Sequence, residues 1–127
     1  MARILVANDD LDLLDTCREV LERAGHTIRA VASGKLALEL ARHWNPDLAL
    51  FDWKMPDMEG TAAIRALRAD PLTAPLPILM MSGSDSGPEE AARAGASGFL
   101  RKPFDADELV SRIAEMLAAA AGAGVPS

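Results

Sequence analysis

Asp52 is the residue of this chain whose position most favours chemistry. It follows the apolar run of residues 48–51 and opens a loop that contains Pro56 and Gly60. A buried strand that ends in a carboxylate presents this group at the edge of a sheet, where a reactant can reach it. The pattern therefore predicts an exposed acid at the C-terminal end of a strand.

Other polar side chains follow apolar runs in the same way. In an open parallel sheet the C-terminal ends of the strands meet at one edge, and sites form where the winding of the chain reverses. We therefore expect these side chains to surround one site together with Asp52. They are Asn8, Asp9, Asp10, Ser82 and Lys102.

The expected site combines several carboxylates with one lysine. Neighbouring carboxylates repel one another unless a hard divalent cation shares them, and Mg²⁺ prefers carboxylates, carbonyls, waters and a phosphate oxygen. Lys102 would place a compact positive charge beside a phosphate, and the Ser82 hydroxyl can donate to a phosphoryl oxygen. Such a group can bind, accept or move a phosphoryl group, mainly through positioning and charge neutralisation.

Apolar runs alternate with amphipathic segments along the chain, which predicts an α/β domain with a doubly wound five-stranded parallel sheet and five helices. Right-handed crossovers leave few topologies for it. We expect one domain over residues 1–121 and a flexible C-terminal tail over residues 122–127. The expected strands are residues 3–8, 27–31, 48–52, 78–81 and 98–101, and the expected helices are residues 11–24, 34–43, 60–69, 88–95 and a last one that begins at Asp105.

Composition narrows the classes of function. The chain has 127 residues and a net charge of −6, which argues against nucleic-acid binding through a basic surface. Its one cysteine, Cys17, allows no internal disulfide and is predicted to be a structural thiol at a partly buried helix position. The sequence shows neither a signal peptide nor an apolar run long enough to span a membrane, so we expect a cytoplasmic protein.

Four stretches of the chain share one family pattern: residues 4–10, 51–60, 81–83 and 95–104. They resemble the receiver domain of two-component response regulators. The second and fourth stretches are highly specific, and together the four extend over nearly the whole chain. The resemblance implies a flavodoxin-like sheet with strand order 2-1-3-4-5. Because no output domain follows, the chain looks like a stand-alone regulator of the chemotaxis type.

The resemblance also implies a role for each site residue. Asp52 matches the phosphoacceptor, which takes a phosphoryl group from a histidine kinase or phosphotransfer protein as an aspartyl phosphate. Asp9 matches the acid that contacts Mg²⁺, together with Asp52 and the backbone carbonyl of Lys54. Ser82 matches the switch hydroxyl, and Lys102 matches the phosphate-binding lysine. Such a phosphoprotein is not an enzyme in the usual sense, since it promotes only its own phosphorylation and dephosphorylation.

Phe99 matches the aromatic residue that turns inward on activation, and the bond between Lys102 and Pro103 matches a cis peptide. Phosphorylation is then expected to change the surface of the fourth helix, fifth strand and fifth helix. That surface would control a downstream protein, could form a homodimer, and would involve neither direct DNA binding nor a membrane. Three arginines in this region are either anchors for an acidic partner or ordinary solvated charges: Arg93, Arg101 and Arg112.

The chain departs from the family at Asn8, which stands where the first of two adjacent acids is usual. This alignment makes Asp9 the second acid and leaves Asn8 to act on the cation through water. An alternative alignment would pair Asp9 with Asp10, but it needs an insertion in the first strand. Since Asn8 removes a negative charge, we expect weaker Mg²⁺ binding than in a relative with both acids.

Two other classes of function remain open at this point. A degenerate receiver would never accept phosphate and would serve as an interaction or dimerisation module. Asn8 favours this class, and it is opposed by four other site residues together: Asp9, Asp52, Ser82 and Lys102. A phosphatase of the haloacid dehalogenase type would also use an aspartate with Mg²⁺. That class places its nucleophile after the first strand with a second aspartate two residues later, a pattern that the chain lacks.

Overall fold

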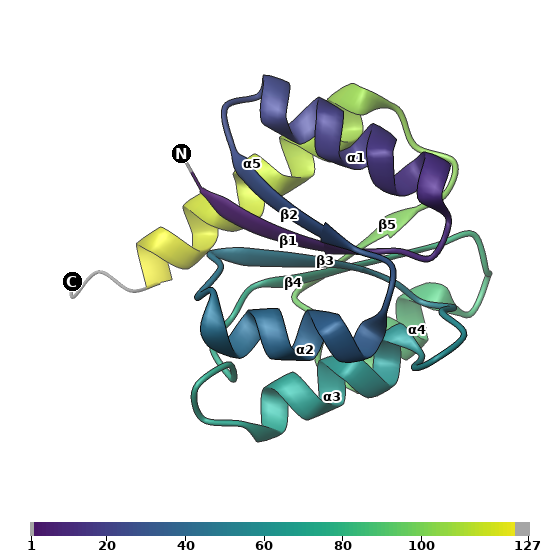
Figure 1. Cartoon of the computed structure of the whole chain (residues 1–127), viewed down its shortest axis with the longest axis vertical. Helices are drawn as coiled ribbons and strands as arrows, with labels where there is room; N and C mark the ends of the chain where they lie inside the picture. The colour runs from purple at the N-terminus through teal and green to yellow at the C-terminus, as the bar shows by residue number, and fades with distance from the viewer. Residues whose placement is uncertain (1, 124–127) are drawn as a thin grey trace.

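The computed structural model describes residues 2–123, in which strands and helices alternate from end to end (Figure 1). All the predicted elements are present, and their bounds mostly agree with the expected ones to within one residue. The strands are β1 (Arg3–Ala7), β2 (Thr27–Val31), β3 (Leu48–Asp52), β4 (Ile78–Ser82) and β5 (Gly98–Arg101). The helices are α1 (Leu11–Arg23), α2 (Gly34–His43), α3 (Gly60–Ala69), α4 (Gly87–Ala94) and α5 (Ala106–Ala123).

The five strands form one parallel sheet in the order β2-β1-β3-β4-β5, which confirms the predicted flavodoxin-like topology. β1 lies beside both β2 and β3, so the winding of the chain reverses between β1 and β3. In this register Ala7 of β1 pairs with Phe51 of β3. The residues that follow these two are Asn8 and Asp52, and the reversal therefore places them next to each other at the C-terminal edge of the sheet.

Different helices cover the two faces of the sheet (Figure 1). α1 and α5 pack on one face, while α2, α3 and α4 pack on the other. The side chains of each strand alternate between these two cores: Leu5 and Ala7 of β1 face α2–α4, whereas Ile4 and Val6 face α1 and α5. Because both faces are covered, β3 and β4 are buried along their whole length.

Local caps fix where several helices begin and end. The Ser33 hydroxyl accepts the N–H of Leu36 at the start of α2, and Gly25 and Gly95 follow α1 and α4 with φ of 99° and 100°. Asp105 was expected to begin the last helix but precedes it. Its carboxylate accepts the N–H of Glu108 at 2.8 Å, as the cap of a helix does.

α5 continues to Ala123 and so includes the first two residues of the segment predicted to be a flexible tail. Alanine has the highest intrinsic helix propensity, which accounts for a helix that extends through the alanine-rich run after Ala118. The remainder of the predicted tail, residues 124–127, lies outside the described residues. In the part of the chain that the structure describes, no helix is long and apolar enough to cross a membrane.

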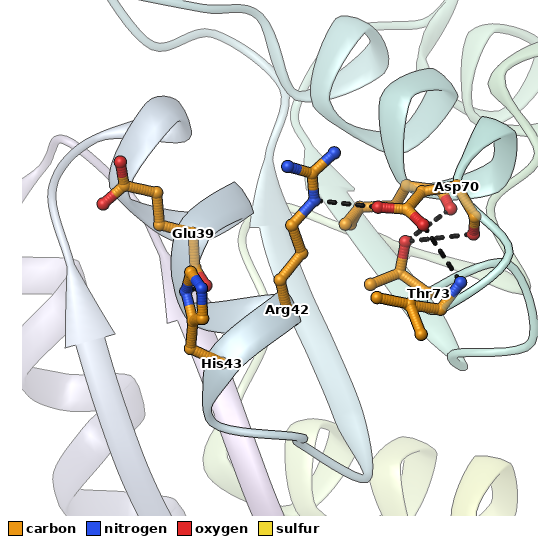
Figure 2. Close-up of polar contacts among 7 residues, drawn as sticks. Glu39, Arg42, His43, Asp70 and Thr73 are labelled. Carbon is orange, nitrogen blue, oxygen red and sulfur yellow. Dashed lines mark hydrogen bonds and ion pairs between the residues drawn. The ribbon is translucent and has the colours of Figure 1, made fainter.

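An ion pair joins α2 to the end of α3, on the face of the sheet that these helices cover (Figure 2). Arg42 Nε lies 2.8 Å from Asp70 Oδ2, and the Thr73 hydroxyl donates to the Leu67 carbonyl at 2.7 Å. In the same view the His43 ring contacts the backbone of its own helix, with Nδ1 3.0 Å from the Glu39 carbonyl oxygen. These contacts have a structural role, since each ties a helix end to its neighbour or to itself.

Candidate functional site

Asp52 and Lys102 form an ion pair at the C-terminal edge of the sheet, with Lys102 Nζ 2.5 Å from Asp52 Oδ1. The lysine follows β5, and its N–H donates to the Ser82 carbonyl at the end of β4. Only 8% of the Asp52 side chain is exposed, against 29% of the Lys102 side chain. The expectation of an exposed acid is therefore wrong, because the carboxylate lies recessed beneath its lysine.

Burial is the main influence on the charge of Asp52. It raises the pKa of this carboxyl, because a charge removed from water is less stable. The hydrogen bond and the positive charge of Lys102 act in the opposite direction, while repulsion from Asp9 raises the pKa further. Asp9 is thus close enough to Asp52 for their charges to interact, as two acids that share a cation must be.

The structure separates the roles of Asp9 and Asp10. The Asp10 carboxylate turns toward α1, where Oδ1 accepts the N–H groups of Asp12 and Leu13 at 3.1 and 3.2 Å. Asp10 is therefore the N-cap of α1. Asp9 is exposed, and its carboxylate caps no helix in the described part of the chain. This difference favours the alignment that makes Asp9 the metal-binding acid.

Asn8 is fully buried beside these acids. Its Oδ1 accepts the N–H of Asp10 at 3.0 Å, which fixes the orientation of the side-chain amide. Its Nδ2 is also buried and finds no hydrogen-bond partner within residues 2–123. The residue that replaces the first acid of the family pattern thus brings an unused donor to the site.

Ser82 and Phe99 are brought together through Gly87, a residue that the sequence analysis did not single out. Ser82 is buried, and its Oγ accepts the N–H of Ser84 at 3.0 Å. A Cβ atom at Gly87 would lie 2.7 Å from the Phe99 ring and 3.3 Å from Ser82 Cβ. The first residue of α4 therefore has to be small for the Phe99 ring to occupy this place. In the sequence, only the glycine directly before Pro88 indicated such a close contact.

Lys54 follows Asp52 by two positions, but its ammonium group does not turn toward the carboxylate. Nζ lies 4.2 Å from the centre of the Trp53 ring and 3.3 Å from Glu59 Oε1. The Trp53 side chain is buried in the core between the sheet and α2–α4. The Lys54 side chain therefore covers the indole at the rim of the site.

The residues present fit a magnesium ion, which the family pattern implies. Asp9 and Asp52 supply two mutually repelling carboxylates, and the Lys54 carbonyl accepts no hydrogen bond within the described residues. Two carboxylates, a carbonyl and waters are a suitable donor set for Mg²⁺. Within residues 2–123 no cluster of three or more His, Cys, Asp or Glu side chains is placed to hold a metal ion, so the acids alone do not form a complete cage.

Three further features of the chain lie outside the group around Asp52 and Asp9. Cys17 is fully buried, and burial raises the pKa of its thiol to about 11, which is consistent with a structural role. His26 lies after α1, where its Nδ1 faces the N–H of Ala2 at 3.3 Å. The peptide bond between Lys102 and Pro103 is cis, as the family resemblance implied.

Asp57 holds the loop after β3 against the start of α2, a role that sequence reasoning missed. Its carboxylate accepts the Ser33 hydroxyl at 2.8 Å and the N–H groups of Gly34 and Lys35 at 3.1 Å. These hydrogen bonds lower the pKa of Asp57 to about 2. The loop that carries Lys54 is thus anchored at its far end to another helix.

We expect Asp57→Asn to lower the melting temperature by a few degrees at neutral pH. The folded pKa is below the unfolded value of about 3.9, so the carboxylate stabilises the fold above about pH 4. This contribution is lost as the pH falls toward 2. Urea unfolding of both proteins across this range tests the idea, and a difference that persists undiminished at the acidic end contradicts it.

Comparisons with known proteins agree with this geometry. The family model described as "Response regulator receiver domain" matches residues 4–114. Protein PilH of Pseudomonas aeruginosa is 32% identical over 93% of this chain and 99% of its own length. The DNA-binding dual master transcriptional regulator RpaA of Synechocystis is 33% identical over 92% of this chain, which spans only 49% of that protein. The chain thus spans about half the length of some relatives and nearly all of another.

Solved structures give the same result. The chemotaxis response regulator CheY4 of Vibrio cholerae has a TM-score of 0.86 and 29% identity, over 91% of this chain and 98% of that one. The receiver domain of the Francisella response regulator 1452 also has a TM-score of 0.86, with 28% identity over 94% and 98% of the two chains. Both likenesses extend across the described sheet and its helices.

Proposed function

The chain belongs to the response regulator receiver domain family, and we propose that Asp52 is where it accepts a phosphoryl group from a histidine kinase or phosphotransfer protein. The observation that carries this proposal is the buried ion pair between Asp52 and Lys102, with Asp9 close by. Lys102 supplies a counter-charge to the buried Asp52 carboxylate, and Asp9 is an acid with which Asp52 can share a cation. No other acid in the described part of the chain is buried against a lysine in this way.

Transfer requires Asp52 to act as a nucleophile. Lys102 contacts Oδ1, which leaves Oδ2 to attack the phosphorus while the bond from phosphorus to the donor's imidazole nitrogen breaks. The Lys102 ammonium stays beside the incoming oxygens and offsets their charge. Mg²⁺, when bound by Asp9, Asp52 and the Lys54 carbonyl, would supply further charge neutralisation.

We expect Asn8→Asp to tighten Mg²⁺ binding several-fold, because a third carboxylate at the site adds negative charge. Titration with MgCl₂, followed by tryptophan fluorescence or calorimetry, measures the affinity. Asn45→Asp changes the net charge equally at the opposite edge of the sheet and serves as the matched control. Equal affinities in wild type and Asn8→Asp contradict the prediction.

The signal would leave the site through Ser82 and Phe99. A phosphoryl group adds about two negative charges at the strand edge, and a Ser82 hydroxyl that turns toward it changes the wall against which Phe99 packs. A Cβ atom at Gly87 of α4 would meet both side chains, so a change in the position of either bears directly on α4. Phosphorylation then shifts the balance between two conformations of the surface formed by α4, β5 and α5.

Gly87→Ala tests this contact. A methyl group here would overlap the Phe99 ring, so we expect the ring to be displaced and the protein to lose about 1–3 kcal/mol of stability. Gly83→Ala is the control, since its Cβ would make only an ordinary contact with Lys102. Aromatic NMR signals of Phe99 and thermal unfolding give the two readouts, and unchanged Phe99 signals in Gly87→Ala would refute the coupling.

The proposed partners are proteins alone. A phosphodonor acts at the strand edge, and a downstream target or a second copy of the chain binds the surface of α4, β5 and α5. The chain is then a cytoplasmic phosphoprotein that promotes only its own phosphorylation and dephosphorylation. Its net charge of −6 supports protein rather than nucleic-acid partners for this domain.

A degenerate receiver is the second candidate, and Asn8 is the observation that favours it. Incubation with acetyl phosphate and Mg²⁺, read by intact mass, separates the alternatives. We expect a single phosphoryl adduct in the wild type and none in Asp52→Ala. An absent adduct in the wild type supports the phosphorylation-independent module, and repeated turnover of added phosphoesters supports a hydrolase.

A further inference from the structure

The side-chain amide of Asn8 has one end engaged and one end free. Oδ1 accepts the N–H of Asp10 at 3.0 Å, whereas Nδ2 is buried and has no hydrogen-bond partner in the described part of the chain. A backbone N–H can only donate, so its partner must be the amide oxygen. The free end is therefore an NH₂ group, a donor that is held in place inside the site.

The strand geometry places Asn8 on the same face of the sheet as Asp52. Even-numbered residues of β1 and β3 pack toward α1 and α5. Asn8 continues this alternation, because its N–H donates to the Val31 carbonyl at 3.1 Å and so extends the pairing of β1 with β2. Ala7 pairs with Phe51, and hence Asn8 and Asp52 are neighbours that leave adjacent strands on one face.

Among the described residues no acceptor lies within hydrogen-bond distance of this donor. Lys102 engages Asp52 Oδ1, and Asp10 engages α1. A buried donor without a partner is unfavourable, and the cost is relieved when an acceptor arrives. A phosphoryl group on Asp52 would bring three strongly accepting oxygens to this place.

We propose that Asn8 is a catalytic residue whose Nδ2–H donates to a phosphoryl oxygen during transfer to Asp52, and that this donor makes the reaction less dependent on a divalent cation. The inference rests on the proposed function of Asp52. With acetyl phosphate as donor, the bond from Asp52 Oδ2 to phosphorus forms as the bond from phosphorus to the acetate oxygen breaks, and acetate leaves with the electron pair. The Asn8 proton stays on nitrogen throughout.

An aspartate at position 8 would act in the opposite way. It would present a third negative charge, which attracts a cation but repels the phosphoryl oxygens when no cation is bound. Compared with an aspartate, Asn8 attracts the metal less strongly, but it supplies a hydrogen-bond donor that is fixed in the protein. This role differs from an effect through a metal-bound water, because it persists when the metal is removed.

The test compares rates of adduct formation with acetyl phosphate in MgCl₂ and in EDTA, by intact mass. We expect a measurable rate for the wild type in EDTA and a rate about tenfold lower for Asn8→Ala, a difference of about 1.4 kcal/mol in activation free energy. The loss in MgCl₂ should be smaller. Asn45→Gly, which replaces the other asparagine at a position with φ of 60°, should behave as the wild type.

Asn8→Asp keeps the size of the side chain and an acceptor for Asp10 but lacks the donor, so it serves if Asn8→Ala does not fold. It should lose the rate in EDTA and recover it in MgCl₂. Equal rates of wild type and Asn8→Ala in EDTA overturn the inference, as does a wild type that reacts only with Mg²⁺. A wild type that forms no adduct in either condition shows instead that the proposed function of Asp52 is wrong.

Discussion

Asp52→Asn is expected to abolish the phosphoryl adduct and at the same time to raise the melting temperature at neutral pH. The loss of the adduct should be complete, because an amide oxygen is not a nucleophile toward phosphorus under these conditions. The gain in stability follows from burial, which raises the pKa of the Asp52 carboxyl above its unfolded value. The ionised carboxylate is thus unfavourable for the fold.

The sign of the pH dependence makes this prediction specific. A raised folded pKa gives stability that is fully present below the unfolded pKa of about 3.9 and is lost as the pH rises through the folded pKa. The wild type should therefore be less stable than Asp52→Asn at pH 7, and the two should converge in acid. Thermal unfolding from pH 7 down to about pH 3.5 measures the difference, and a wild type that is the more stable protein at neutral pH contradicts it.

Lys102→Met is expected to slow phosphorylation by acetyl phosphate about 10²–10³-fold, even with saturating Mg²⁺. Two effects act together. The charge that offsets the incoming phosphoryl oxygens is lost, and the pKa of Asp52 rises further because Lys102 no longer lowers it. Lys102→Arg should retain part of the rate, since the charge remains but its planar guanidinium is broader than an ammonium.

The matched control is Lys35→Met, which removes the same charge from an exposed position on α2. Its rate should equal that of the wild type. If Lys102→Met reacts within about threefold of Lys35→Met, a difference of less than 1 kcal/mol in activation free energy, the lysine does not provide the counter-charge assigned to it.

The sheet and the set of residues around Asp52 could be predicted because they depend on local signals. Apolar runs that end in acids mark the strands, and strand ends of a parallel sheet converge. The sequence therefore indicated which residues meet. It did not indicate that Asp52 is recessed beneath Lys102, because burial depends on how the loops after β3 and β5 close over the sheet.

The features that were missed depend on contacts between distant segments. Asp57 binds the start of α2 from the loop after β3, and Gly87 leaves room for a ring that belongs to β5. Arg68 of α3 donates to the carbonyls of Gly95 and Leu76 and so joins two loops to its own helix. None of these residues repeats at a spacing typical of a helix or strand, so periodicity gave no sign of them.

Asn8 shows where a departure from a family pattern becomes informative only with the structure. In the sequence alone, Asn8 is an asparagine in place of the usual acid, and so it removes a negative charge from the metal site. In the structure it is a buried amide with its oxygen fixed on Asp10 and its nitrogen free, which is a different chemical group rather than a missing one. The same residue therefore weakens one interaction of the site and offers another.

Identification of the modified side chain tests the central claim most directly. The protein is phosphorylated with acetyl phosphate and Mg²⁺ and then reduced with borohydride, which converts an aspartyl phosphate to homoserine that peptide mass spectrometry can locate. The account predicts homoserine at position 52 and at no other acid. Homoserine at Asp9 or Asp10, or a phosphoryl group that is found on another type of side chain, would contradict it.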